Sequence, residues 1–299
     1  MRYTALILMV LMAVPAWAGF VAYPMETRLL EADLVAVGTV GKTKSTFKRT
    51  RDYALATMQI TDVVKGNKEL KTVDVAFAAK SLIQSDRVRK DGDTGLWLMR
   101  LDDSGDFYWI DRPSDLQSVA DKDKFAKQIE KLGGLEWGPA VEGLQALVRG
   151  QLAPDVDRTS EPSPHQLENP TVTVLQVFIK NSSDKPICIC DFAGDKPVKL
   201  QCQVTGGPVQ PIDFYGDFHA TLSRANFITL HPGQVRAVGG TGGAYRLLPF
   251  TEPGDYTLTA TYTATRDGKA FQVDNVWTGQ LTSAAIKIHF KAQRDLPAR

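Results

Sequence analysis

The stretch Leu34-Val35-Ala36-Val37-Gly38-Thr39-Val40 is the first of several short apolar runs, and these runs decide the fold class. A longer run from Tyr53 to Val64 follows, in which apolar residues alternate with Thr and Gln. Lys65-Gly66-Asn67 then turns the chain, and apolar and polar residues alternate again through 72–77. A period of two is typical of half-buried strands, so the sequence predicts three strands joined by loops and turns.

Two further apolar runs, 96–99 and 107–110, flank Asp102-Asp103-Ser104-Gly105-Asp106. Gly and Asp favour tight connections, so this segment predicts a hairpin. Its three carboxylates could bind Ca²⁺, but the further spaced ligands of an EF-hand loop do not follow them, and we interpret the segment as a polar hairpin tip. The basic stretch 42–51 between the first two strands is interpreted as a solvated loop.

After the hairpin the period changes to that of helices. Apolar residues recur at helical spacing from 119 to 132, and Gly133-Gly134 supplies a stop. Pro139 fits the first turn of a second helix that would run to Gly150. The apolar stripe of that helix would consist of Val141, Leu144 and Val148. We expect both helices to pack against the preceding sheet.

The remaining half has the pattern of a second β module. Residues 151–170 combine prolines with polar side chains, which is typical of an interdomain linker. The apolar runs that follow are 172–179, 198–204, 227–230, 245–248, 256–262, 270–273 and 284–290. Seven or eight short strands over roughly 120 residues predict a β-sandwich.

The N-terminus has the three parts of a secretory signal. A short basic start precedes the apolar run Ala5–Val14, and small residues at Ala16 and Ala18 suit the peptidase, so we expect cleavage between Ala18 and Gly19. A membrane anchor is the alternative, but the run is half the roughly 20 residues that span a bilayer. No later segment is long and apolar enough to span, so the expected location is the periplasm or the cell exterior.

Composition supports an ordinary globular chain and argues against one class of partner. The 299 residues are 43% hydrophobic and carry 35 Lys+Arg against 34 Asp+Glu, a net charge of +1. Loss of Arg2 with the leader would leave the mature chain neutral. A neutral chain has no overall field that attracts nucleic acid, so we expect no nucleic-acid partner.

The three cysteines, Cys188, Cys190 and Cys202, all fall in the second half. In an oxidising compartment we expect a disulfide from Cys202, on the strand after the other two, to Cys190 or to Cys188. A thiolate site for Cu(I) or Zn(II) is the alternative, and the odd thiol could also pair between molecules.

One polar cluster could hold a cation. In a strand, Asp213, Tyr215, Asp217 and His219 would share a face, although Gly216 would break the alternation. No nucleophile elbow, zinc-protease motif, Walker loop or dinucleotide fingerprint occurs, so no cofactor and no catalytic residue are predicted. Asp213, Asp217 and His219 remain the candidates for a metal site.

Two resemblances add to this pattern. The stretch 32–40, with 56–64 and Lys65-Gly66, resembles the start of the netrin-like and TIMP-like group of OB-type barrels. In the members of that group that inhibit metalloproteases, an N-terminal Cys binds the protease zinc. Here the expected N-terminus is Gly19, and Cys188 is the first Cys. The resemblance therefore implies the fold, while the residue of the inhibitory mechanism is missing.

The second half resembles the immunoglobulin-like or fibronectin-III-like sandwiches of secreted bacterial proteins. The resemblance is carried by Pro253-Gly254-Asp255-Tyr256 and by Val276-Trp277-Thr278-Gly279-Gln280-Leu281-Thr282-Ser283. It implies an adhesive, spacing or ligand-holding module. As a whole, the chain resembles uncharacterised secreted proteins of bacteria.

The expected fold is mainly β, with an N-terminal OB-like, netrin-like barrel and two packing helices, followed by a C-terminal Ig-like β-sandwich. The expected organisation is a signal peptide 1–18, the barrel domain 19–150, the Pro-rich linker 151–170, the sandwich 171–290 and a tail 291–299. The leading functional hypothesis is a secreted, non-enzymatic protein that binds a protein or carbohydrate partner. The alternatives are an extracytoplasmic protease inhibitor and a metal-dependent hydrolase.

Overall fold

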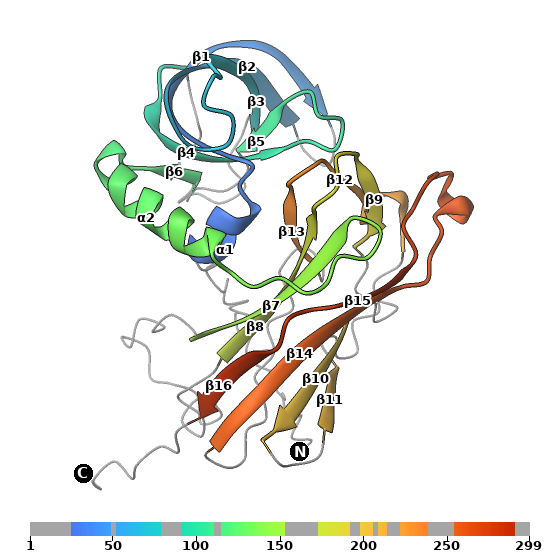
Figure 1. Cartoon of the computed structure of the whole chain (residues 1–299). Helices are drawn as coiled ribbons and strands as arrows, with labels where there is room; N and C mark the ends of the chain where they lie inside the picture. The colour runs from blue at the N-terminus through green and yellow to red at the C-terminus, as the bar shows by residue number, and fades with distance from the viewer. Residues whose placement is uncertain are drawn as a thin grey trace, which may run out of the picture.

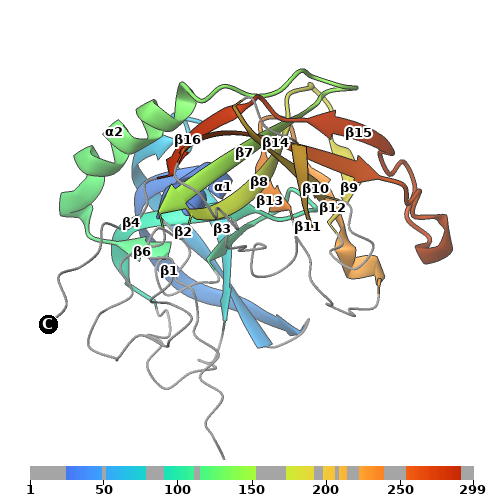
Figure 2. The same cartoon turned by 90° about the horizontal axis from the view of Figure 1, so that it is seen from below.

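The computed structural model describes residues 25–48, 52–78, 91–110, 115–152, 173–191, 198–205, 209–213, 222–238 and 254–290. As predicted, the chain is mainly β. The described residues contain two short α-helices, α1 (Met25–Glu31) and α2 (Lys122–Gly133). Figures 1 and 2 both place α2 at the edge of the molecule, beside the barrel strands. No helix in these ranges has both the length and the apolar character needed to cross a bilayer.

The first half forms a closed five-stranded barrel (Figure 1). Its strands are β1 (Leu34–Lys48), β2 (Asp52–Lys65), β3 (Thr72–Ala78), β4 (Thr94–Leu101) and β5 (Tyr108–Ile110). The order is β1-β2-β3-β5-β4, and β4 pairs back with β1. Only the β3–β5 pairing is parallel within the barrel. The two-residue strand β6 (Leu116–Gln117) pairs with the other side of β4.

Closure depends on bulges and on small residues in β1. The β1–β2 register shifts at four places, and such bulges increase the twist that bends a sheet into a barrel. A Cβ atom at Gly38 would lie 2.7 Å from the carbonyl oxygen of Gln59, so the two strands approach closely there. Trp97 of β4 fills the interior and donates its indole N–H to the Gly38 carbonyl at 2.9 Å.

The predicted strands at 34–40, 53–64, 72–77, 96–99 and 107–110 are confirmed, as is the 102–106 hairpin. The loop predicted at 42–51 is wrong for 42–48, because these residues continue β1. Backbone pairing such as Ser45 with Leu55 supplies the hydrogen bonds, while the side chains of 42–46 are exposed. Exposure of every side chain removed the apolar period that marks a strand in sequence.

The second predicted helix is also wrong. Residues Leu144–Leu152 form β7, which pairs with β8 (Thr173–Asn181). The left-handed residues Glu142 (φ 50°) and Gly143 (φ 86°) turn the chain into this strand. Two residues of the predicted helical stripe, at 144 and 148, also fit the period of two of a strand. The same residues are therefore compatible with a helix and with a strand. Helix α2 is confirmed, and the unpredicted α1 supplies the other helix.

The described residues of the second half form three sheets (Figure 1). One has the order β13-β8-β7, with β13 (Val235–Val238); one pairs β12 (Phe227–Leu230) with β9 (Ile187–Cys190). The third has the order β11-β10-β14-β15, with β16 also on β14. Its strands are β10 (Val198–Val204), β11 (Val209–Asp213), β14 (Gly254–Ala264), β15 (Gly279–Thr282) and β16 (Ile286–Phe290). Side chains from all three sheets meet in one core that includes Leu144, Ile179, Ile189 and Leu258.

The strand predicted at 270–273 is wrong. Residues Lys269–Phe271 form a 3₁₀ turn between left-handed Gly268 (φ 76°) and Gln272 (φ 56°). Two left-handed residues four positions apart prevent a continuous extended strand. The run 245–248 lies outside the described residues, as do the leader 1–18, most of the linker and the tail 291–299.

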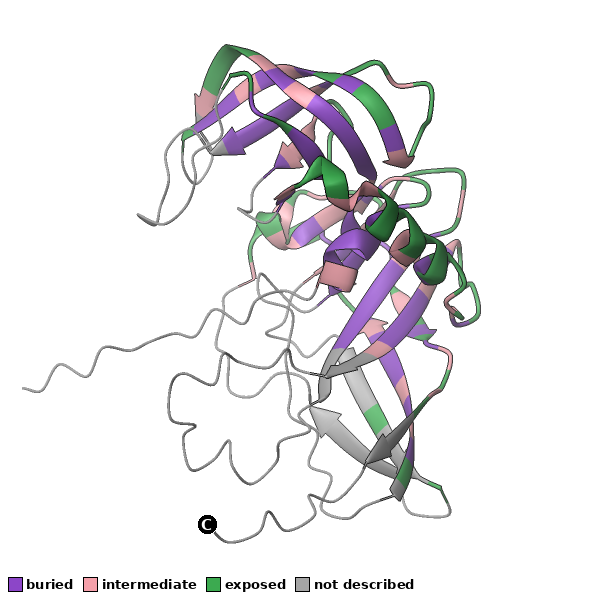
Figure 3. Ribbon diagram, turned by 90° about the vertical axis from the view of Figure 1, so that its left-hand side faces the viewer, coloured by how far each residue is buried: buried purple, intermediate pink, exposed green. Residues whose placement is uncertain are grey.

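The two halves share a third core. It includes Leu30 of α1, Val35 of β1 and Phe125 of α2 from the first half, and Leu147 of β7 and Phe178 of β8 from the second. Figure 3 shows α1 largely buried and one face of α2 exposed. Because β7 pairs along its whole length with β8, this sheet also crosses the predicted boundary at residue 150.

Buried polar groups connect the same surfaces. The Oδ2 atom of Asp33 accepts hydrogen bonds from the Leu101 amide, from Gln234 Nε2 and from Arg236 Nη2 at 2.8, 3.0 and 3.1 Å. Glu31 accepts from Arg236 through its carbonyl and from the Ala237 amide through its carboxylate. We call this set of residues the joint.

Candidate functional site

The predicted metal site lies mostly outside the described residues. Asp213 ends β11, where its backbone pairs with Lys199, while Asp217 and His219 lie outside the described residues. Within the described ranges, no group of three or more His, Cys, Asp or Glu side chains could hold a metal ion. The hypothesis of a site at Asp213, Asp217 and His219 therefore stays a prediction.

The cysteines lie on strands of different sheets. Cys188 and Cys190 are on β9, where both contact a small apolar cluster with Phe227. Cys202 is on β10, which pairs with β11 and β14 and not with β9. Cys202 therefore lies on the next strand along the chain, as expected, but in a different sheet from Cys188 and Cys190. No disulfide joins Cys188 to Cys190, and a disulfide to Cys202 stays a prediction.

The Cys188 thiol is half-buried and free. Burial raises its pKa, and the nearby Asp103 carboxylate raises that pKa further. A raised pKa keeps the thiol protonated at neutral pH, whereas a nucleophile or a metal ligand needs the thiolate. The environment of Cys188 therefore gives no support to thiol catalysis.

The most distinctive surface feature is a group of aromatic side chains on the outside of the barrel. We call it the aromatic patch, and it comprises Phe47, Tyr53, Phe107 and Trp109. Tyr53 and Trp109 meet edge to face with ring centroids 4.8 Å apart, and Phe107 meets Trp109 in the same way at 5.0 Å. Phe47 stacks on Tyr53 at 5.5 Å with 22° between the ring planes. All these separations fall in the range of favourable aromatic pairs.

Strand alternation places these rings on one surface. In β2 the neighbouring Ala54 faces the barrel core, so Tyr53 points outward, and in β5 Ile110 faces the core, so Trp109 points outward. The strand between them contributes Ala76, which pairs with Leu55 on one side and with Trp109 on the other. Such a small side chain leaves room for the large rings to meet across β3.

The β1–β2 pairing adds Phe47, because Phe47 lies directly opposite Tyr53. Phe47, Phe107 and Trp109 are half-buried, while Tyr53 is buried beneath its neighbours. The patch therefore exposes parts of three rings. Contiguous apolar surface with a polar rim is characteristic of binding sites.

Polar groups at the hairpin tip form the rim. Asp102 Oδ1 accepts the indole N–H of Trp109 at 2.7 Å, which fixes the ring relative to the hairpin. Ser104 binds the other carboxylate oxygen of Asp102 through its hydroxyl at 2.8 Å and its amide at 3.1 Å. Asp106 lies exposed beside them. Carboxylates thus border the aromatic patch on the side of the β4–β5 hairpin.

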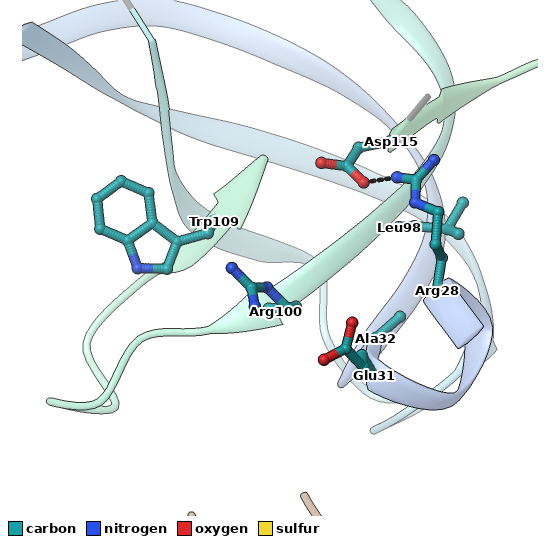
Figure 4. A pocket seen from close by; sticks show the side chains of 7 residues that line it. All are labelled: Arg28, Glu31, Ala32, Leu98, Arg100, Trp109 and Asp115. Carbon is teal, nitrogen blue, oxygen red and sulfur yellow. Dashed lines mark ion pairs between the residues drawn. The ribbon is translucent and has the colours of Figure 1, made fainter. Parts of the chain in front are cut away.

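A small pocket adjoins the patch behind Trp109 (Figure 4). Trp109 and Arg100, a cross-strand pair, lie at one end, and the ion pair of Arg28 with Asp115 lies at the other. The pocket encloses about 10 Å³, roughly the space of one water molecule. It is too small for a substrate, so a ligand of this region would bind on the surface.

Sequence reasoning missed the aromatic patch. Phe107 and Trp109 were assigned only to a strand, and Phe47 fell in the stretch predicted to be a loop. The sequence did contain one signal for the patch, the alternation around Tyr53 and Trp109. In each strand the residue next to the aromatic one faces the core, so the aromatic ring faces outward. Their meeting depends on the β2-β3-β5 order, which no local pattern contains.

No protein-family model matches the chain, and no curated protein matches it in sequence.

Proposed function

We propose that the chain is a secreted, non-enzymatic binding protein and that its aromatic patch binds a carbohydrate. The observation that carries this proposal is the gathering of four aromatic side chains, from three strands and the β4–β5 connection, on the outside of the barrel, three of them partly exposed. Aromatic rings offer flat apolar faces against which sugar rings stack, and the exposed Asp106 carboxylate is an acceptor suited to sugar hydroxyls.

The strand order supports assigning the barrel to the OB type. Barrels of this type have five strands and bind oligonucleotides and oligosaccharides between the β1–β2 and β4–β5 connections. The aromatic patch occupies this position, since Phe47 and Tyr53 flank the first connection and Phe107 is the last residue of the second. We further propose that the second half is an immunoglobulin-like module, which the facing antiparallel sheets around one core support.

Charge on the β4–β5 side of the aromatic patch favours a carbohydrate over a nucleic acid, whereas the stretch 42–51 on the β1–β2 side is basic. Asp102, Asp103 and Asp106 place three carboxylates at the β4–β5 hairpin, where they would repel a phosphate backbone. The whole chain carries a net charge of only +1, so it has no overall field that attracts a polyanion. An uncharged or weakly charged sugar is compatible with both facts.

The two alternatives have less support. The protease inhibitor depends on the netrin-like resemblance, in a chain whose expected N-terminal residue is Gly19. The hydrolase depends on Asp213, Asp217 and His219, of which only the Asp213 backbone belongs to the described residues. Secretion depends on the leader with its expected cleavage between Ala18 and Gly19.

A binding experiment with the mature chain tests the proposal. A panel of soluble oligosaccharides is titrated by calorimetry, first with the wild type and then with Phe107→Ala. We expect at least one sugar to bind, and the substitution to weaken it about tenfold, which corresponds to about 1.4 kcal/mol. Phe271→Ala is the matched control, because Phe271 is also a half-buried Phe beside another ring, at 5.5 Å from Phe227, but packs in an apolar cluster of the second half.

The proposal fails if no sugar in the panel binds the wild type, or if Phe107→Ala and Phe271→Ala weaken binding equally. If Phe107→Ala and alanine substitutions at the other patch residues all leave sugar binding unchanged, the sugar binds elsewhere on the molecule.

A further inference from the structure

The hairpin that carries Phe107 and Trp109 touches the second half of the chain at His231, the residue after β12. The Nε2 atom of His231 lies 3.1 Å from the carbonyl oxygen of Asp103 at the hairpin tip. A carbonyl oxygen only accepts hydrogen bonds, so Nε2 carries the hydrogen and donates it. This contact joins residues 128 positions apart in the sequence.

The imidazole ring also lies against the hairpin backbone. A Cβ atom added to Gly105 would be 3.1 Å from Cε1 of His231, closer than nearly all such contacts. Gly105 also has a φ of 83°, a left-handed conformation that glycine adopts without steric cost. The His231 ring therefore packs directly against the backbone of the hairpin tip at Gly105, where no side chain lies between them.

A short path leads from this contact to the aromatic patch. Asp103 is bonded to Asp102, whose carboxylate accepts the Trp109 indole N–H at 2.7 Å. The amide of Asp102 donates to the carbonyl oxygen of Phe107 at 2.8 Å. The Asp103 carbonyl shares a planar peptide unit with the Ser104 amide, which donates to Asp102 Oδ2 at 3.1 Å. A shift of this Asp103–Ser104 unit would therefore move Asp102, which binds both Phe107 and Trp109.

His231 is itself held in place. Its amide donates to Gln234 Oε1 at 2.7 Å, and Gln234 Nε2 donates to Asp33 Oδ2 at 3.0 Å. The same oxygen of Asp33 accepts the amide of Leu101, the last residue of β4. The 231–234 turn thus fixes the hairpin at its tip through His231 and at its base through Asp33.

We propose that His231 is a positioning residue for the aromatic patch, so that the second half of the chain helps to shape the binding surface of the barrel. This inference rests on the proposed function for its effect on ligand binding. It does not require His231 to touch the ligand. It also assigns a role to the second half beyond that of a spacer.

The test uses the full mature chain with two substitutions of different chemistry. His231→Phe keeps a ring that can lie against Gly105 but removes the donor, whereas His231→Gln keeps an N–H at nearly the same distance from the backbone. We expect His231→Phe to weaken sugar binding about threefold to tenfold, the effect of one net hydrogen bond. His231→Gln should restore binding.

A spectroscopic readout separates positioning from general stability. The indole N–H resonance of Trp109, assigned by its loss in Trp109→Phe, should shift in His231→Phe and return toward the wild-type position in His231→Gln. Ser182→Ala is the matched control, because it removes a side-chain hydrogen bond to the Gly143 carbonyl within the second half and should move neither readout.

An unchanged indole resonance together with unchanged binding in His231→Phe would overturn the inference. Failure of the wild type to bind any sugar would instead remove the proposed function, and the indole resonance alone would then decide whether His231 positions Trp109.

Discussion

The Nη2 atom of Arg236 in β13 lies 3.1 Å from the Oδ2 atom of Asp33, the residue that precedes β1. The side chains of Arg236 and Asp33 are only 9% and 13% exposed, so this ion pair is buried between the two halves of the chain. Arg236 Nη1 donates to the carbonyl oxygens of Glu31 and Val235, and Nη2 also donates to the carbonyl oxygen of Leu101. A buried ion pair with this many additional hydrogen bonds fixes the position of one half on the other.

The first prediction concerns this pair. Asp33→Ala leaves the Arg236 charge buried without its carboxylate, so the free energy of unfolding should fall by about 3–5 kcal/mol. Asp62→Ala breaks the exposed pair with Lys122, 2.7 Å long, and should cost under about 1 kcal/mol. Urea unfolding of both variants measures the difference. Equal small losses in the two variants would contradict a structural role for the joint.

Lys65 gives a prediction about pH. Its Nζ atom donates to the carbonyl oxygens of Leu29 and Leu30 at the end of α1, at 2.8 and 3.0 Å. Burial lowers the pKa of Lys65 from 10.5 to about 8, although the charges of Asp33 and Glu31 act in the opposite direction. The folded chain therefore releases this proton at a lower pH than the unfolded chain does.

Between pH 8 and pH 10.5 the unfolded state holds the proton that the folded state has lost, so the contribution of Lys65 to stability rises with pH in this window. Below pH 8 the burial cost of the charge is fully present, and its full relief amounts to roughly 3 kcal/mol. Lys65→Met removes the titration. We expect the free energy of unfolding, measured at pH 7.5 and pH 10, to change more favourably for the wild type than for Lys65→Met. Parallel changes would show that Lys65 titrates alike in both states.

Cys188 gives a prediction about reactivity. Because Asp103 helps to raise the pKa of its thiol, Asp103→Asn should lower that pKa and speed alkylation at pH 7.5 severalfold. Asp267→Asn, which removes a carboxylate paired with Lys269 in the β14–β15 connection, is the control and should leave the rate unchanged.

Mass spectrometry of the alkylated mature chain also tests the disulfide expected at Cys202. Because Cys190 is only 4% exposed, the labelled sites are counted after alkylation in denaturant without reductant. One labelled site at Cys188 then agrees with a Cys190–Cys202 bond, whereas three labelled sites exclude any disulfide.

Local patterns correctly predicted the strands in which every second residue is buried. They failed where this period of two was absent, or where the same residues also fitted a helix. Tyr53–Val64 and the hairpin at 102–106 were predictable because alternation and Gly and Asp content are local properties. Leu144 and Val148 fit both helix and strand, and the pairing with β8 decided between them. The partners of Asp33 and Trp109 could not be predicted, because their contacts join strands whose order depends on the whole chain.

The last prediction concerns Ala76, which is fully buried although it lies on the outside of the barrel. Its neighbours Val75 and Phe77 both face the interior, so Ala76 faces outward and must be covered by side chains of the outer surface. Its cross-strand partner on β5 is Trp109, whose ring meets Tyr53 at 4.8 Å. Ala76→Leu would place a branched side chain where these rings pack.

We therefore expect Ala76→Leu to separate Tyr53 from Trp109 and to weaken sugar binding, in addition to the roughly 1–3 kcal/mol that overpacking costs in stability. Ala146→Leu is the matched control, since Ala146 is equally buried but packs in the core of the second half. Both variants should lose stability, yet only Ala76→Leu should lose affinity when each is measured well below its melting temperature. Equal affinity in the two variants would show that the contact between Tyr53 and Trp109 does not shape the binding surface.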